Sequence, residues 1–162
     1  MITIESMFYS GECLIDIRSS GCRDGSFKGS HIRVNWTNVH YSDKPGIYLA
    51  LVDPIACTGT PFPITNPHGV GAEAAQILVS YINLLTAGQI VAGATHHEPS
   101  TNIGVVRAAL EGLGVRALNT LDGCGKFAFV AQKGSPLKTV ATVKKAAEGN
   151  LWLVVKLTGG EC

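Results

Sequence analysis

The densest cluster of polar side chains in the chain is the run Thr95-His96-His97-Glu98. Two imidazoles beside a carboxylate are residue types that can bind a transition metal. In an extended strand, however, neighbouring side chains point to opposite faces, so His96 and His97 could share one ion only if the chain bends, for example at Pro99. We therefore expect no metal site here. We interpret the run as a solvated connection from a strand to a helix, a place where ligands commonly bind.

A second polar connection runs from Asp122 to Lys126 around Gly123-Cys124-Gly125. Its glycine-lysine pair is typical of a phosphate-binding loop, but no glycine stands five residues earlier. In addition, Phe127 replaces the hydroxyl residue that would bind magnesium. The run Gly69–Ala74 matches a dinucleotide-binding GxGxxA pattern, but a proline-rich loop precedes it where a strand is required. We expect no cofactor at either place.

The sequence gives little support for a catalytic site. A nucleophilic Cys124 would need a nearby cation or a helix N-terminus, and Lys126 is close to it only in sequence. Glu98 and Asp122 could form the carboxylate pair of a glycoside hydrolase, although no spacing demands it. We expect that the protein is not an enzyme, and a polysaccharide-acting hydrolase is the least favoured alternative.

Both polar connections lie in one block of alternating helices and strands. An i, i+3, i+4 stripe of apolar residues predicts a helix over 71–85, and glycine caps predict a second helix over 101–113. Short apolar runs predict strands at 89–95, 115–121 and 127–132. The helices are expected to position the polar residues without taking part in binding.

The rest of the chain predicts strands. Apolar and β-branched runs favour strands at 2–9, 13–18 and 31–36, and a fully buried central strand at 46–52. A turn-rich segment is expected at 19–30, and a long proline-containing loop at 54–71. The segments 139–144 and 150–158 are predicted to pair as a closing hairpin. The expected fold is therefore α+β, with about eight strands and two helices in a single domain of residues 1–162.

The strand at 31–36 alternates between two faces. Its alternation predicts a solvated face and a buried face. The residues expected on the solvated face are His31, Arg33 and Asn35, and those expected on the buried face are Ile32, Val34 and Trp36.

Composition excludes several classes of function. The net charge of +1 in 162 residues gives no field that would attract nucleic acid. No run of about 18 apolar residues occurs, so we expect no membrane insertion. Residues 1–14 lack the basic and long apolar regions of a signal peptide, so we expect either a mature chain or another export route.

The five cysteines are scattered along the sequence, and no CxxC motif occurs. Buried or half-buried free thiols in a reducing compartment are the favoured interpretation, and a Cys13–Cys22 disulfide is the alternative. Cys162 is expected to be exposed.

Residues 46–136 resemble a known family. The matching pieces, in order, are GIYLALVDP, LVSYINLLTAGQIVAGATHHEPSTN, VRAALEGLGVRAL and FAFVAQKG, and a weaker match upstream is SSGCRDGSFKGSHIRVN. They resemble the interleukin-like EMT inducer domain, which occurs in small secreted factors, in a cell-surface hyaluronidase family and in the stem of a glycosyltransferase. The resemblance implies a β-sandwich flanked by helices. It also implies either a lectin-like or a secreted-ligand function, because some members bind glycans.

The chain departs from the family pattern before its late strand. The family often carries an aromatic-Arg-Asp-Ser-aromatic stretch there, and in the segment from Gly123 to Phe127 only Phe127 keeps the aromatic character. The ligand-binding residues that the two connections suggest are Thr95, His96, His97, Glu98, Asn102, Asp122, Lys126 and Phe127.

We expect a non-enzymatic, lectin-like glycan-binding or attachment module. Its expected place is a virion, on a phage tail or capsid surface assembled in a host cytoplasm, and the alternative is a secreted protein. The expected partners are a glycan or surface polysaccharide, together with other virion proteins or a second copy of the chain. A purely structural assembly or decoration protein without a ligand is the alternative function.

Overall fold

The computed structural model describes residues 2–6, 12–22, 24, 29–42, 45–62, 72–97, 103–116, 118–121 and 123–159. Within these ranges the chain forms ten strands and two α-helices, so the predicted α+β fold is confirmed. The strands are β1 (Ile2–Ser6), β2 (Glu12–Gly21), β3 (Ser30–Val34), β4 (Thr37–Ser42), β5 (Gly46–Asp53), β6 (Thr58–Pro61), β7 (Ile90–His97), β8 (Lys126–Gln132), β9 (Val140–Lys144) and β10 (Leu151–Gly159). The helices are α1 (Ala72–Leu84) and α2 (Ile103–Gly112), with short 3₁₀ helices η1 (Leu118–Thr120), η2 (Pro136–Lys138) and η3 (Ala146–Glu148).

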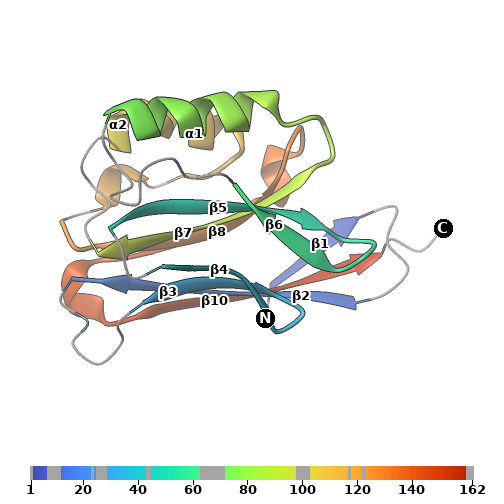
Figure 1. The fold of residues 1–162 in the computed structure, drawn as a ribbon, viewed down its shortest axis with the longest axis horizontal. Helices are drawn as coiled ribbons and strands as arrows, with labels where there is room; N and C mark the ends of the chain where they lie inside the picture. The colour runs from blue at the N-terminus through green and yellow to red at the C-terminus, as the bar shows by residue number, and fades with distance from the viewer. Residues whose placement is uncertain are drawn as a thin grey trace.

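The strands form two sheets that pack face to face (Figure 1). The outer sheet has the order β1-β10-β2-β3-β4, and the central sheet has the order β6-β5-β7-β8-β9. Both helices cover the face of the central sheet that points away from the outer sheet (Figure 1). The described part of the chain therefore has three layers, and the far face of the outer sheet carries no helix.

An apolar core fills each space between layers. Ile15, Ile17 and Ile32 of the outer sheet pack against Ala92 and Val130 of the central sheet. The second core joins the helices to the other face of the central sheet, and its members include Leu78, Ile82, Val106, Leu110, Phe127 and Phe129. The apolar stripe predicted for the helix at 71–85 lies on the surface of α1 that this second core buries.

Strand β5 contributes to both cores. Ala50 and Val52 belong to the core between the sheets, whereas Ile47 and Leu49 belong to the core under the helices. The prediction of a central strand buried on both faces is confirmed, because alternate side chains of a strand point to opposite faces.

Strand β2 joins the two sheets and is longer than predicted. Its middle pairs with β3 and β10, while Ser20 and Gly21 pair in parallel with His96 and His97 of β7. Gly21 allows this close approach, because a Cβ atom there would lie 2.1 Å from the carbonyl oxygen of Cys124. The segment expected to begin a turn at Ser19 therefore continues as a strand to Gly21.

Two strands were not predicted, and one predicted strand is absent. β4 and β6 are short and half-exposed, so neither has a strong hydrophobic pattern. In the described part of 115–121 the chain forms η1 in place of the expected strand.

The predicted closing hairpin is wrong. β9 pairs with β8 in the central sheet, whereas β10 pairs with β1 and β2 in the outer sheet. The turn η3 carries the chain from one sheet to the other, and the Lys145 backbone N–H donates a hydrogen bond of 2.8 Å to Glu148 Oε2 within it.

The interpretation of the cysteines as free thiols is also wrong. Cys13 of β2 forms a disulfide with Cys57 in the β5–β6 turn, and Cys22 forms one with Cys124. Both bridges link segments that are distant in sequence, so the alternative Cys13–Cys22 pairing is excluded. Cys162 lies outside the described residues. Within the described ranges, no helix has the length and apolarity required to cross a membrane.

Candidate functional site

Four of the residues predicted to contact a ligand have almost no exposed surface. Thr95, Lys126 and Phe127 are 0% exposed, and His96 is 5% exposed. A side chain without exposed surface cannot touch a glycan that approaches from solution. Contrary to the prediction, these four side chains therefore do not contact such a ligand directly. His97 is exposed. The other predicted residues, which lie outside the described ranges, are Glu98, Asn102 and Asp122.

Thr95 and His96 stabilise the junction between the two sheets. The hydroxyl oxygen of Thr95 accepts a hydrogen bond of 3.0 Å from the backbone N–H of Phe127. The Thr95 carbonyl accepts bonds from the hydroxyls of Ser19 at 2.7 Å and Ser30 at 2.8 Å. The Ser30 hydroxyl also lies 2.9 Å from Nδ1 of His96. These contacts fix β2 and β3 against β7 and β8.

Lys126 is one half of a buried ion pair. Its Nζ lies 3.2 Å from the carboxylate of Asp24 and donates a hydrogen bond of 3.3 Å to the carbonyl of Ala146. Asp24 also accepts a bond of 2.6 Å from the backbone N–H of Gly21. The Cys22–Cys124 disulfide lies two residues earlier in both segments, so a covalent and an ionic link hold the same two pieces of chain.

The solvent-facing side of the outer sheet carries exposed aromatic and charged side chains. Trp152 of β10 lies opposite Arg18 of β2, and Arg18 lies opposite His31 of β3. His31 in turn lies opposite Tyr41 of β4. We call this surface the aromatic platform, and its members are Asp16, Arg18, His31, Arg33, Trp36, Tyr41 and Trp152. The prediction that His31 and Arg33 face solvent on β3 is confirmed, since both point to this side.

A buried carboxylate organises the platform. Asp16 is 1% exposed although it points to the solvent side, because other members of the platform cover it. Arg33 donates to its Oδ2 from Nε at 2.7 Å and also from Nη2. The indole N–H of Trp152 donates to Oδ1, and Nε2 of His31 lies 3.5 Å from the same oxygen. Asp16 therefore holds a guanidinium and an indole in one fixed arrangement.

Trp36 does not lie on the buried face, where the alternation predicted it. Strand β3 ends at Val34, which pairs with Thr37, so Asn35 and Trp36 form a two-residue turn. Both turn residues have positive φ, 49° and 65°, which is costly for a bulky side chain such as Trp. The Trp36 side chain is 61% exposed, and the Arg33 guanidinium lies 5.4 Å from its ring centroid. The two-residue hairpin turn thus places an exposed indole beside Arg33 at the end of β3.

The other two rings are also held in place. The guanidinium of Arg18 stacks over Trp152 at 4.2 Å from the ring centroid. Tyr41 lies against the backbone at Gly29, where a Cβ atom would come within 2.6 Å of the phenol ring. Trp152 is 54% exposed and Tyr41 is 59% exposed, so both rings remain open to a ligand.

Burial favours the neutral form of the two histidines of β3 and β4. Burial lowers the pKa of His31; Arg33 and Arg18 lower it further, and the nearby Asp16 carboxylate partly opposes this. Burial also lowers the pKa of His40, whose ring stacks on Tyr48 with a centroid distance of 4.4 Å.

His40→Phe is expected to reduce the loss of stability in acid. Unfolded His40 takes up its proton near the ordinary pKa of 6.5, whereas the folded side chain resists protonation. Stability from this group is therefore complete above about pH 6.5 and is lost as the pH falls toward the lower folded pKa. Phenylalanine keeps the stacked ring and removes the proton uptake. Urea unfolding at several pH values checks this, and the matched control is His97→Asn at an exposed position. A variant as acid-sensitive as the wild type would contradict the assignment.

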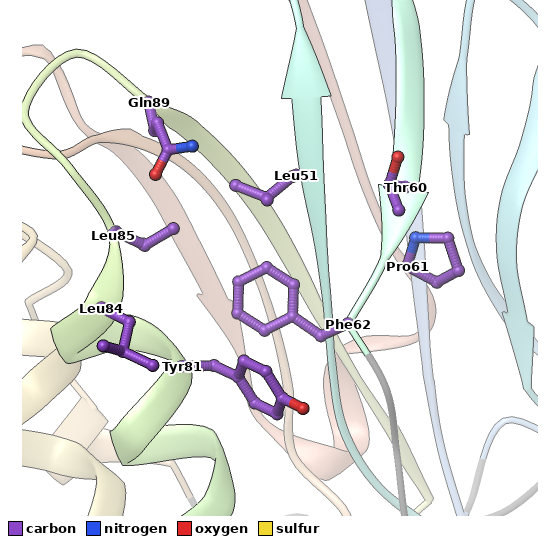
Figure 2. A pocket seen from close by; sticks show the side chains of 8 residues that line it. All are labelled: Leu51, Thr60, Pro61, Phe62, Tyr81, Leu84, Leu85 and Gln89. Atoms are coloured by element: carbon purple, nitrogen blue, oxygen red, sulfur yellow. The ribbon is translucent and has the colours of Figure 1, made fainter.

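An apolar groove lies between helix α1 and strands β5 and β6 (Figure 2). Its volume is about 340 Å³, within the range of small ligand sites. The rings of Phe62 and Tyr81 lie side by side in it, with centroids 5.4 Å apart, and Leu51 and Leu85 point toward them. The lining residues are Leu51, Thr60, Pro61, Phe62, Tyr81, Leu84, Leu85 and Gln89. None is charged, so the groove can bury an apolar group but offers few hydrogen bonds.

Part of the chain matches a protein family. The family described as interleukin-like EMT inducer matches residues 45–135, which is more than half of the 162 residues. The chain belongs to the interleukin-like EMT inducer family. No curated protein matches the chain.

The interleukin-like EMT inducer match covers the scaffold and not the platform. It includes β5 to β8 and both helices, together with the buried residues Thr95 and Phe127. All members of the aromatic platform lie before residue 45 or after residue 135. The match therefore covers both helices and the central sheet except β9, and the chemistry of the platform depends on residues outside the match. The sequence alone does not indicate the platform, because the strands that form it are distant along the chain.

Proposed function

We propose that the protein is a non-enzymatic, lectin-like module that binds a glycan on the aromatic platform. The observation that carries the proposal is the buried carboxylate of Asp16, which holds Trp152 and Arg33 together at the surface. Sugar rings pack their C–H faces on aromatic rings, while their hydroxyls form hydrogen bonds with charged groups. A surface that holds both kinds of group in place loses little side-chain entropy when a ligand binds.

The surroundings of the protein are part of the proposal. Two disulfides are typical of proteins outside reducing compartments. We propose that the module is secreted or exposed on a virion, where a surface polysaccharide is its partner.

Trp152→Ala and Trp36→Ala are each expected to weaken glycan binding about tenfold or more, because each removes an exposed ring on which a sugar packs. A glycan array identifies the ligand, and titration calorimetry on the strongest hit measures the two variants. Leu137→Ala is the matched control, since Leu137 is 97% exposed in η2, outside the outer sheet. An array without hits, or variants that bind as tightly as the control, would contradict the proposal.

A structural assembly function is the second candidate. Trp, Tyr and Arg are also the residues most enriched in the energetic centres of protein interfaces. If the array gives no ligand and Trp152→Ala breaks up an oligomer of the wild type, the platform is an assembly surface. Size-exclusion chromatography with light scattering distinguishes the two outcomes.

A further inference from the structure

The aromatic platform hides its negative charge and presents its positive charge. The side chain of Asp16 is 2% exposed, whereas that of Arg33 is 27% exposed. Arg18, the other arginine of the platform, is half-buried on top of Trp152. A ligand on this surface therefore meets guanidinium groups before it meets a carboxylate.

Arg33 keeps hydrogen-bonding capacity that Asp16 does not use. A guanidinium has five N–H donors, and two of its nitrogens, Nε and Nη2, donate to Oδ2 of Asp16. Among the described residues no acceptor pairs with Nη1, so its donors remain for another acceptor. Because Asp16 fixes the orientation of the guanidinium plane, these donors are ordered before any ligand binds.

Apart from Asp16, which pairs with Arg33, the described charges on this face lie away from the arginines. At the far end of β10, Lys156 forms an ion pair with Glu12 of β2, so the two charges balance each other. His31 lies between the two arginines, and burial lowers its pKa and so favours its uncharged form. On the described outward side of β2, β3, β4 and β10, the charged groups beside the two indoles are Arg18, Arg33 and Asp16, which leaves a formal excess of one positive charge.

We propose that the glycan bound on the aromatic platform is acidic and that Arg33, together with Arg18, binds its carboxylate or sulfate groups. A sugar ring packs on Trp152 or Trp36 while an anionic oxygen accepts charge-assisted hydrogen bonds from the guanidinium. This inference rests on the proposed function, because it names the class of glycan that the same surface takes.

Two pairs of probes differ in charge and share a backbone. Polygalacturonate is compared with its methyl ester, and dextran sulfate is compared with dextran. Each acidic probe is expected to bind at least about tenfold more tightly than its neutral partner, since a hydrogen bond to a charged group is worth about one decade or more in affinity. Binding to the acidic probe is expected to weaken when sodium chloride rises from about 50 to about 500 mM. Preference for one acidic probe alone identifies the carboxylate or the sulfate as the recognised group.

Arg33→Lys keeps the charge and loses the planar pair of donors, so it is expected to weaken acidic-probe binding about tenfold. Arg18→Gln is a second variant in case the first disturbs the contact with Asp16. Lys156→Gln removes one positive charge from the same face, away from the indoles, and is expected to bind like the wild type. Equal loss in Lys156→Gln would overturn the proposal, because it would show unspecific charge attraction.

The outcomes separate this inference from the proposed function. If acidic and neutral probes bind equally, and Trp152→Ala abolishes both, the protein binds glycans but not through their charge. If no probe binds and the glycan array is also silent, both the inference and the proposed function are wrong.

Discussion

Asp24→Asn is expected to lower the free energy of unfolding by about 3–5 kcal/mol, among the largest effects of any single substitution in this protein. Lys126 is 0% exposed, and the side chain of Asp24 is 4% exposed. The asparagine amide can still accept the hydrogen bond from Gly21, but it carries no charge to balance the ammonium group. The remaining acceptor, the carbonyl of Ala146, is 3.3 Å away and is neutral. An unbalanced charge in a dry interior is the reason for the expected cost.

The double variant Asp24→Asn with Lys126→Met is the matched control. Methionine has a similar length and brings no charge, so the pair is expected to recover most of the lost stability. Urea unfolding of the wild type, both single variants and the double variant gives the coupling energy of the pair. A cost below about 1 kcal/mol for Asp24→Asn would mean that water reaches Lys126, and the buried ion pair would be refuted.

The same double variant separates the scaffold from the proposed glycan site. Lys126 was predicted as a ligand-binding residue on the basis of its place in a connecting segment, and it lies in the interior instead. If the platform is the binding surface, the double variant binds glycans like the wild type. The position of a charged residue in a loop therefore does not establish that it is exposed.

The sequence patterns predicted elements that bury a clear face. The apolar run at Gly46–Val52, the stripe of the first helix and the caps of the second helix were sufficient, because each pattern fits one kind of element. β4 could not be predicted in the same way, since a register shift between Ile32 and Arg33 breaks the alternation with its partner. β6 could not be predicted either, because its four residues have no hydrophobic pattern of their own and form a strand by pairing with β5.

The aromatic platform could not be predicted because it depends on long-range pairing. The alternation at 31–36 correctly gave the solvated positions His31 and Arg33. Nothing in the local pattern indicates that Trp152 lies beside Arg18, because β10 was expected to pair with β9. Once β10 joins the outer sheet, the aromatic and charged residues of four strands form one surface.

The disulfide pairs were not predictable from spacing, although one signal was present. Cys22 and Asp24 stand two residues apart, and so do Cys124 and Lys126. A bridge between Cys22 and Cys124 would bring these two opposite charges together. It is one of several pairings that the sequence allows. Sequence alone could not choose it, because cysteine spacing does not determine connectivity.

Removal of the Cys22–Cys124 disulfide is expected to cost about 3–5 kcal/mol. The bridge closes a loop across a sequence separation of 102, and a long loop restricts the unfolded chain strongly. Cys22→Ser with Cys124→Ser tests this by urea unfolding, and Cys13→Ser with Cys57→Ser, which opens the shorter separation of 44, is the matched comparison.

In native protein, mild reductant is expected to open the Cys22–Cys124 bridge before the Cys13–Cys57 bridge, because Cys22 is exposed and Cys13 is 0% exposed. Mass spectrometry after alkylation counts the thiols; opening of Cys13–Cys57 first would contradict the expected order.

The two largest effects are expected to be coupled. The Cys22–Cys124 disulfide and the Asp24–Lys126 pair hold the same two segments, the end of β2 and the start of β8. Without the disulfide these segments can separate, so water can reach the ammonium group of Lys126 when Asp24 is replaced. Asp24→Asn should therefore cost less in the background of the two serine substitutions than in the wild type, by an amount of about 0.5–3 kcal/mol. Strict additivity would mean that the ion pair stays dry without the bridge, and that packing of β8 against β7 alone closes this end of the molecule.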